Sequence, residues 1–146
     1  MTVRELLKTK SSQIVTTSPK ESVKAAMSLL IERKISCLPV VDEGARLIGI
    51  ISDKDIFVKL YETEGNFKDC TVGEIMSSDL IIGLPDDEVS YVAGLMTNNR
   101  IRHIPVLEAD KLIGLVSVGD VVKTQMENIK VENRYLKSYI EGTYPG

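Results

Sequence analysis

Apolar residues follow a helical spacing over residues 23–31, and a similar spacing returns over residues 89–96. Each of these predicted helices is followed by two β-rich segments joined by a polar turn. The segments read "CLPVV" and "LIGIIS" after the first helix, and "HIPVL" and "LIGLVS" after the second. A short apolar strand is predicted before each helix, at residues 13–16 and 80–82. The same elements therefore appear twice, in the same order.

A second helix is predicted to start at each of two Ser-x-x-Asp motifs. Ser52 is followed by Asp55, and Ser117 by Asp120, and each motif precedes an apolar stretch. A serine that caps a helix, with an acidic residue three positions later, is a common way to begin one. The full pattern is thus β-α-β-β-α, twice. Short helical segments, "TVRELLKT" and "TVGEIM", precede the two sets, and residues 65–70 link them.

The two sets are copies of one another. Pro39 falls on Pro105 at a spacing of 66, and Asp55 falls on Asp120 at a spacing of 65. The one-residue slip lies between "DEGAR" and "EADK", which are turn-rich stretches where a hairpin absorbs a change in length at small cost. A register that is kept everywhere except at a plausible loop indicates an internal duplication.

The duplication predicts an α/β (α+β) fold in which two β-α-β-β-α domains pack about a pseudo-twofold axis. One hairpin with two helices buries too little apolar surface alone, so the two copies are expected to pack sheet to sheet. The predicted division is residues 1–65, residues 66–125, and a C-terminal helix and tail over residues 126–146. Two symmetry-related clefts between the copies are the expected places for small ligands.

Composition narrows the possible classes of function. The 146 residues carry a formal net charge of -3 and are 43% hydrophobic, so no basic excess is present for binding nucleic acid. No apolar run approaches the roughly 20 residues of a membrane-spanning helix, and the N-terminus lacks the pattern of a signal peptide. Cys37 and Cys70 lack metal or redox spacing, and His103 is the only histidine. We therefore expect a cytoplasmic protein without a metal, a membrane or a nucleic-acid partner.

The paired motifs resemble those of the cystathionine-β-synthase (CBS) domain family. The aliphatic-Pro-Val segments "CLPVVD" and "HIPVLE" are followed by the strand-to-helix junctions "LIGIISDKD" and "LIGLVSVGD", in order and at matching spacing. The likeness covers residues from about 3 to about 125 as two tandem domains. The C-terminal sequence is also similar to the endings of small stand-alone bacterial proteins with paired CBS domains.

The resemblance implies a regulatory ligand-binding module and not an enzyme, and no catalytic residue or cofactor is expected. Tandem CBS domains usually bind adenosine-containing ligands such as AMP, ADP, ATP or S-adenosylmethionine, and they often form homodimers shaped as flat discs. We expect an adenine nucleotide as the regulatory ligand. The alternatives are S-adenosylmethionine or NAD, or a purely structural dimerisation unit with empty clefts. The output is expected to pass to an unknown effector protein in trans.

Each predicted site combines residues of both copies, as the resemblance implies. The serine lies beside free backbone N–H groups at a helix start, which favour a phosphate, and in the family the aspartate binds ribose hydroxyls. The first predicted site comprises Ser52, Lys54, Asp55, Leu80, Ile81, Ile101, Arg102 and His103. The second comprises Ile14, Val15, Ile35, Ser36, Cys37, Ser117 and Asp120. Helix capping alone is the other interpretation of each Ser–Asp pair, and it is compatible with ligand binding.

The two predicted sites are not expected to be equal. The first offers Lys54, Arg102 and His103 to a phosphate, whereas the second has no positive charge at the corresponding positions. The sequence therefore predicts that a phosphorylated nucleotide prefers the site of Ser52 and Asp55. The other site is expected to bind more weakly, to take an uncharged tail or to stay empty.

Overall fold

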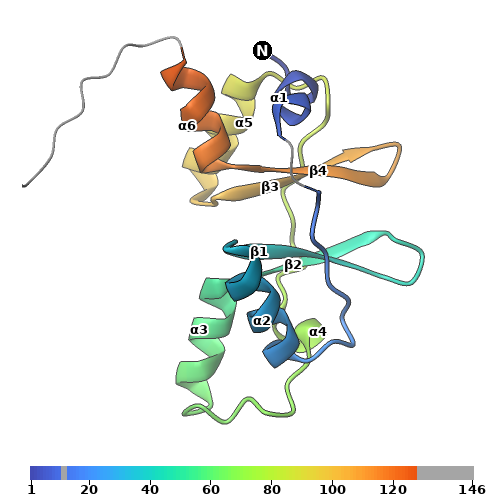
Figure 1. Ribbon diagram of the computed structural model, residues 1–146, viewed down its shortest axis with the longest axis vertical. Coiled ribbons are helices and arrows are strands. Elements are labelled where there is room, and N and C mark those ends of the chain that lie inside the picture. Colours follow the sequence, from blue (N-terminus) through green and yellow to red (C-terminus); the bar gives the residue numbers. More distant parts are fainter. Residues whose placement is uncertain (11–12, 128–146) are drawn as a thin grey trace, which may run out of the picture.

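The computed structural model describes residues 1–10 and 13–127. Its elements form two similar halves, each an antiparallel hairpin covered on its outer side by helices, and the two hairpins face each other (Figure 1). The first hairpin pairs β1 (Cys37–Val41) with β2 (Leu47–Ser52), and the second pairs β3 (His103–Glu108) with β4 (Lys111–Ser117). This arrangement confirms the predicted α+β fold of two packed copies.

The helices occupy the positions that the apolar spacing predicts. They are α1 (Val3–Thr9), α2 (Val23–Arg33), α3 (Asp53–Glu62), α4 (Val72–Ile75), α5 (Val89–Asn99) and α6 (Val118–Met126). Ser52 caps α3 and Ser117 caps α6, so both predicted helix starts are confirmed. The predicted continuation of the last helix beyond residue 127 lies outside the described residues.

The short strands predicted at residues 13–16 and 80–82 are wrong. In the first copy a single parallel bridge joins Thr17 to Val40 in their place. The next hydrogen bond of a parallel ladder towards residue 15 would need the backbone N–H of Pro39, and proline has none. Residues 13–16 are therefore unpaired with the sheet. The second copy repeats this arrangement with Gly83, Val106 and Pro105.

The two hairpins differ in their turns, where the sequence places the one-residue slip. Residues 42–46 connect β1 to β2, whereas β3 and β4 are joined by Ala109 and Asp110 alone. Both of these residues adopt a positive φ, 50° and 64°, as a tight two-residue hairpin turn requires. The position of the slip in a turn is confirmed.

The apolar interior is divided into two clusters, one for each half. The first cluster contains Val23, Ala26, Leu30, Leu38, Val40, Ile51, Ile56 and Val72. The second contains Val3, Leu6, Val89, Val92, Met96, Ile104, Val106, Val116 and Val121. Each hairpin thus presents one face to its own helices and the other to the opposite half.

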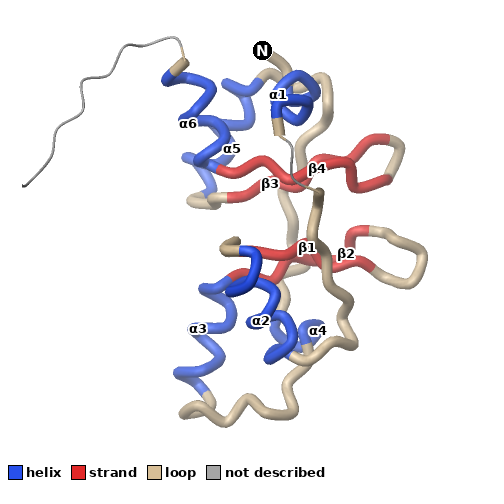
Figure 2. Tube along the Cα trace, in the orientation of Figure 1, coloured by secondary structure: helices blue, strands red, loops and turns tan. Residues whose placement is uncertain are grey.

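The short helices that precede the copies exchange places. Val3 and Leu6 of α1 pack into the cluster of the second copy, and Val72 of α4 packs into that of the first. Backbone bonds accompany each exchange: the Val3 N–H donates to the Asp87 carbonyl at 2.9 Å, and the Val72 N–H to the Glu21 carbonyl at 2.8 Å. Residues 77–83 consequently cross from the first half to the second (Figure 2).

Candidate functional site

Two cavities lie between the two halves. The first cleft has a volume of about 530 Å³ and contains the start of α3, and the second has a volume of about 780 Å³ and contains the end of β4 at the start of α6. Each combines one copy's strand-to-helix junction with the crossing segment and the helix-to-strand turn beside it. In the first cleft these are residues 79–81 and 100–103, and in the second, residues 13–15 and 33–37.

The first cleft brings together every residue of the first predicted site. Its wall includes Ser52, Lys54, Asp55, Leu80, Ile81, Ile101, Arg102 and His103. Ser52, Lys54 and Asp55 come from the first copy and the other five from the second, because the two hairpins face each other. Their part in binding a ligand remains a prediction.

The Ser52–Asp55 pair forms a reciprocal cap at the start of α3. The Asp55 N–H donates to the Ser52 hydroxyl at 3.2 Å, and the Ser52 N–H donates to Asp55 Oδ2 at 2.9 Å. Among the described residues, Asp55 Oδ1 accepts only a long bond, 3.5 Å, from the Ser77 hydroxyl. The capping function is therefore present, and one carboxylate oxygen faces the cleft with capacity to accept further hydrogen bonds.

The second cleft contains six of the seven residues of the second predicted site. They are Ile14, Val15, Ile35, Ser36, Cys37 and Ser117. The seventh, Asp120, forms the same cap with Ser117, whose N–H donates to Asp120 Oδ2 at 2.8 Å. Asp120 does not itself line the cavity, and Lys10, which does, is bound to it.

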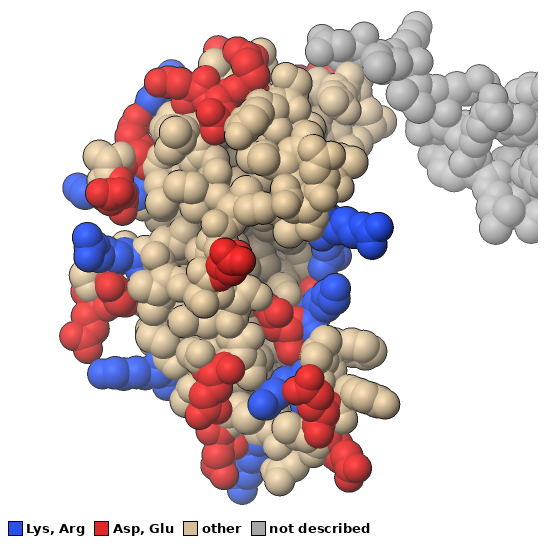
Figure 3. Space-filling view, turned by 180° about the vertical axis from the view of Figure 1, so that it is seen from behind, with Lys and Arg blue, Asp and Glu red and all other residues tan. Residues whose placement is uncertain are grey.

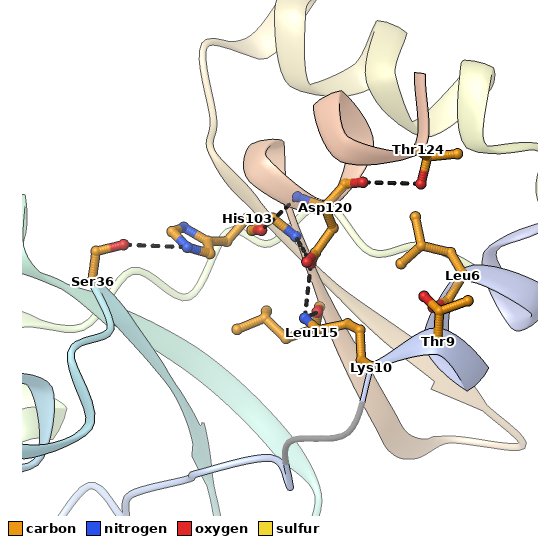
Figure 4. A network of polar contacts seen from close by, with 9 residues as sticks. Leu6, Thr9, Lys10, Ser36, His103, Leu115, Asp120 and Thr124 are labelled. Atoms are coloured by element: carbon orange, nitrogen blue, oxygen red, sulfur yellow. Dashed lines mark hydrogen bonds and ion pairs between the residues drawn. The ribbon is translucent and has the colours of Figure 1, made fainter. Parts of the chain in front are cut away.

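Lys10 and Asp120 form an ion pair at the edge of the second cleft (Figure 4). Lys10 Nζ lies 2.8 Å from Asp120 Oδ2 and donates a second bond to the Leu115 carbonyl at 2.6 Å. Burial disfavours the charged form of Asp120, yet the bonds from Lys10 and Ser117 outweigh it and lower the pKa of this carboxyl. The two side chains are only 27% and 22% exposed, so the pair is screened less than a surface pair.

The positions that correspond to Lys54, Arg102 and His103 carry no positive charge, but the second cleft receives cations from other positions. Lys10, Arg33 and Lys34 all line the second cleft. Sequence comparison between the two copies missed Lys10 because it precedes the first copy along the chain, and only the exchange of α1 brings it to the second. Arg33 and Lys34 could have been predicted from the sequence, because they directly precede Ile35, a residue of the predicted site.

His103 and Cys37 hold equivalent positions in the duplication, and both line both clefts. His103 Nε2 lies 3.2 Å from the Ser36 hydroxyl, which links the two copies between the cavities. Burial and the neighbouring charge of Arg102 lower the pKa of His103, so its neutral form predominates near pH 7. Burial raises the pKa of the Cys37 thiol to about 12, and this residue packs as an unreactive apolar group.

Arg102 lies at the outer part of the first cleft. Its guanidinium donates to Asp53 Oδ1 at 3.0 Å, and its side chain is 60% exposed. An exposed ion pair of this kind is weak. It nevertheless places the Asp53 carboxylate beside Arg102, the residue that is expected from the sequence to bind a phosphate.

The described part of the chain contains no cluster of three or more His, Cys, Asp or Glu side chains arranged to hold a metal. Within residues 1–10 and 13–127, no helix has both the length and the apolar character to cross a membrane.

The fold and the clefts together define a class of protein: two duplicated α+β halves that build composite clefts between them. The family model described as "CBS domain" matches the chain twice, over residues 3–62 and 72–127. The chain therefore belongs to the CBS domain family, as a tandem pair.

Relatives of known sequence and structure are of the same kind. The CBS domain-containing protein YhcV of Bacillus subtilis is 32% identical over 120 residues, covering 82% of this chain and 84% of that protein. A structure of the CBS domain pair of MJ0100, in complex with methylthioadenosine and S-adenosyl-L-methionine, matches with a TM-score of 0.77 and 29% identity, covering 88% of this chain and 98% of that one. CBSX2 of Arabidopsis thaliana in complex with AMP matches with a TM-score of 0.73 and 27% identity, covering 86% and 97%.

Proposed function

We propose that this chain is a cytoplasmic regulatory module that binds an adenine nucleotide, AMP, ADP or ATP, between its two CBS domains and senses its level. The observation that carries the proposal is the first cleft, where a capped helix start and its aspartate face aliphatic residues of the opposite copy. The AMP complex of CBSX2 and the adenosyl ligands of MJ0100 support the same class of ligand.

The chemistry of the first cleft suits a nucleoside. Asp55 Oδ1 is available to accept bonds from ribose hydroxyls, because the cap occupies Oδ2. Leu80, Ile81 and Ile101 offer apolar surface for the faces of a base. Backbone groups of residues 80–82 are unpaired with either sheet, so they can bond to the edge of the base.

A thermal-shift panel of AMP, ADP, ATP, S-adenosylmethionine and NAD tests the proposal. A ligand at about 100 times its Kd adds about 2.7 kcal/mol to the free energy of unfolding, which raises the Tm measurably. Asp55→Ala and Asp120→Ala then assign the ligand to a cleft by titration calorimetry. A shift with S-adenosylmethionine or NAD alone would favour those ligands, and no shift at millimolar concentration would favour a structural dimerisation unit with empty clefts.

We also propose that the module acts as a homodimer. Phe57 and Tyr61 of α3 are 72% and 83% exposed, and Val122 and Met126, their equivalents on α6, are 44% and 50% exposed. Both helices lie on the same side of the molecule, so a second copy related by twofold symmetry can cover both faces (Figure 1). Light scattering of Phe57→Glu should report a monomer where the parent chain reports a dimer; a parent chain that is already monomeric contradicts the proposal. An effector protein in trans would then bind the liganded dimer differently from the empty one.

A further inference from the structure

The second cleft carries an excess of positive charge. Three basic side chains line it, from Lys10, Arg33 and Lys34, and no acidic side chain does so among the described residues. Asp120, the cap partner of Ser117 at the edge of this cleft, is already paired with Lys10. Arg33 and Lys34 are exposed and form no ion pair with another residue in the described ranges. An anion that enters this cleft therefore meets two cations without a paired carboxylate, Arg33 and Lys34, and a third, Lys10, whose charge Asp120 partly offsets.

The first cleft is balanced in charge. Its basic lining residues are Lys54, Lys59, Arg100 and Arg102, and its acidic ones are Asp55, Glu62, Glu74 and Asp79. On the face turned away in Figure 1, acidic and basic side chains lie side by side around the junction of the halves (Figure 3). A phosphate in this cleft gains attraction from the cations and loses much of it to the neighbouring carboxylates.

The backbone N–H groups at the starts of α3 and α6 also differ, and this difference again favours an anion at the second cleft. At α3, Asp53 caps the backbone N–H of Lys54 with its own side chain, at 2.8 Å. At α6 the equivalent residues are Val118 and Gly119, and the Gly119 N–H has no side-chain acceptor among the described residues. An open N–H at a helix start, aligned with the helix dipole, attracts an anion. This feature is independent of the lysine and arginine side chains.

We propose that the second cleft, rather than the first, binds the phosphate group of the nucleotide. Lys10 is the residue that determines this preference for the second cleft. The inference rests on the proposed function and reverses the preference that the sequence predicts. Lys10 Nζ neutralises Asp120 at 2.8 Å and keeps a third N–H beyond its bonds to Asp120 and the Leu115 carbonyl. The first cleft, with its balanced charge, takes the uncharged nucleoside at least as well as the nucleotide.

Titration calorimetry of the full chain with AMP and with adenosine tests the role of Lys10. Loss of one charge-assisted bond to phosphate should weaken AMP binding by Lys10→Met about tenfold to a hundredfold, while adenosine binding changes by less than about threefold. Lys10→Arg keeps the charge and should restore most of the AMP affinity. Lys24→Met removes a lysine from the exposed face of α2, away from both clefts, and should leave both affinities unchanged.

Several outcomes overturn the proposal. Lys10→Met with unchanged AMP affinity removes the assigned role, and tighter AMP binding would mean that Lys10 blocks the cleft. An equal loss for adenosine and AMP would show a structural effect on the cleft, which the melting curve of the variant would also report. A loss of AMP affinity in Lys54→Met without one in Lys10→Met would place the phosphate in the first cleft.

Inorganic pyrophosphate separates this inference from the proposed function. Amide resonances of Val118 and Gly119 should shift on titration with pyrophosphate, ahead of those of Asp53 and Lys54. If no adenine compound binds but these shifts occur, the proposed function fails and the anion preference of the second cleft stands. If AMP binds while pyrophosphate shifts only Asp53 and Lys54, or shifts neither pair, the function stands and the preference is overturned.

Discussion

Val3→Ala is expected to destabilise the second half of the molecule, although Val3 precedes the first copy in the chain. The side chain is fully buried in the cluster of the second copy. The substitution removes two methyl groups, or about 1.6 kcal/mol of transfer free energy at about 0.8 kcal/mol each. The cavity left behind raises the expected loss in the free energy of unfolding to about 2 to 3 kcal/mol.

Val72→Ala is the matched control. Val72 holds the equivalent position in α4, is also fully buried, and packs into the cluster of the first copy. Native-state hydrogen exchange followed by NMR measures the opening free energy at single amides. Val3→Ala should lower it at Ile104 and Val116, and Val72→Ala at Leu38 and Ile51, by about 2 kcal/mol each wherever the halves open separately.

Loss of protection in the first copy from Val3→Ala, with the second copy spared, would refute the exchange of the two helices. An equal loss throughout the protein from both variants would mean that the halves unfold as one unit. In that case amide chemical shifts of the folded variants discriminate: Val3→Ala should shift resonances around Ile104 and Val116, and Val72→Ala those around Leu38 and Ile51.

Two further predictions concern packing and pH. A Cβ at Gly49 would lie 2.6 Å from Met76 Sδ and 3.0 Å from the backbone carbonyl oxygen of Ser77. Gly49→Ala should therefore lower the free energy of unfolding, measured in urea, by about 1 to 3 kcal/mol. Gly94 faces open space on α5, and Gly94→Ala should raise that free energy by about 0.5 to 1 kcal/mol. Burial and Arg102 lower the pKa of His103, so the unfolded chain binds a proton more readily and stability falls as pH drops below about 6.5. His103→Gln should lose less stability over that range, and a loss equal to that of the parent chain would contradict the argument.

The duplication made most of the architecture predictable. Helices and hairpins repeat the same apolar spacing, and each repeated motif confirmed the register of the other. The exception lies at residues 13–16 and 80–82, where an apolar run predicts a strand. The prolines that identify the hairpins also remove the N–H groups that a third strand would need. Apolar composition predicted strands there, but neither segment pairs with a sheet, and Ile14 and Ile82 are 37% and 39% exposed.

The partners of the short leading helices could not be predicted from the sequence. "TVRELLKT" and "TVGEIM" have similar apolar positions, and either pattern fits the cluster of either copy. Periodicity indicates which face of a helix is buried and carries no information about the surface that covers it. Lys10 follows α1 directly. Because the sequence does not show where α1 packs, it also does not show that the charge of Lys10 lies at the second cleft.

Under the proposed function, the exchange also links ligand binding to the association of the two halves. Residues 13–17 follow α1, which is packed in the second cluster, and end at Thr17, which pairs with Val40 of the first sheet. Ile14 and Val15 of this segment line the second cleft. Leu80 and Ile81 occupy the same place in the first cleft, between α4 in the first cluster and Gly83 at the second sheet. One wall of each cleft is thus a segment with one end anchored in the first half and the other end in the second. A ligand that contacts this segment stabilises the association of the two halves.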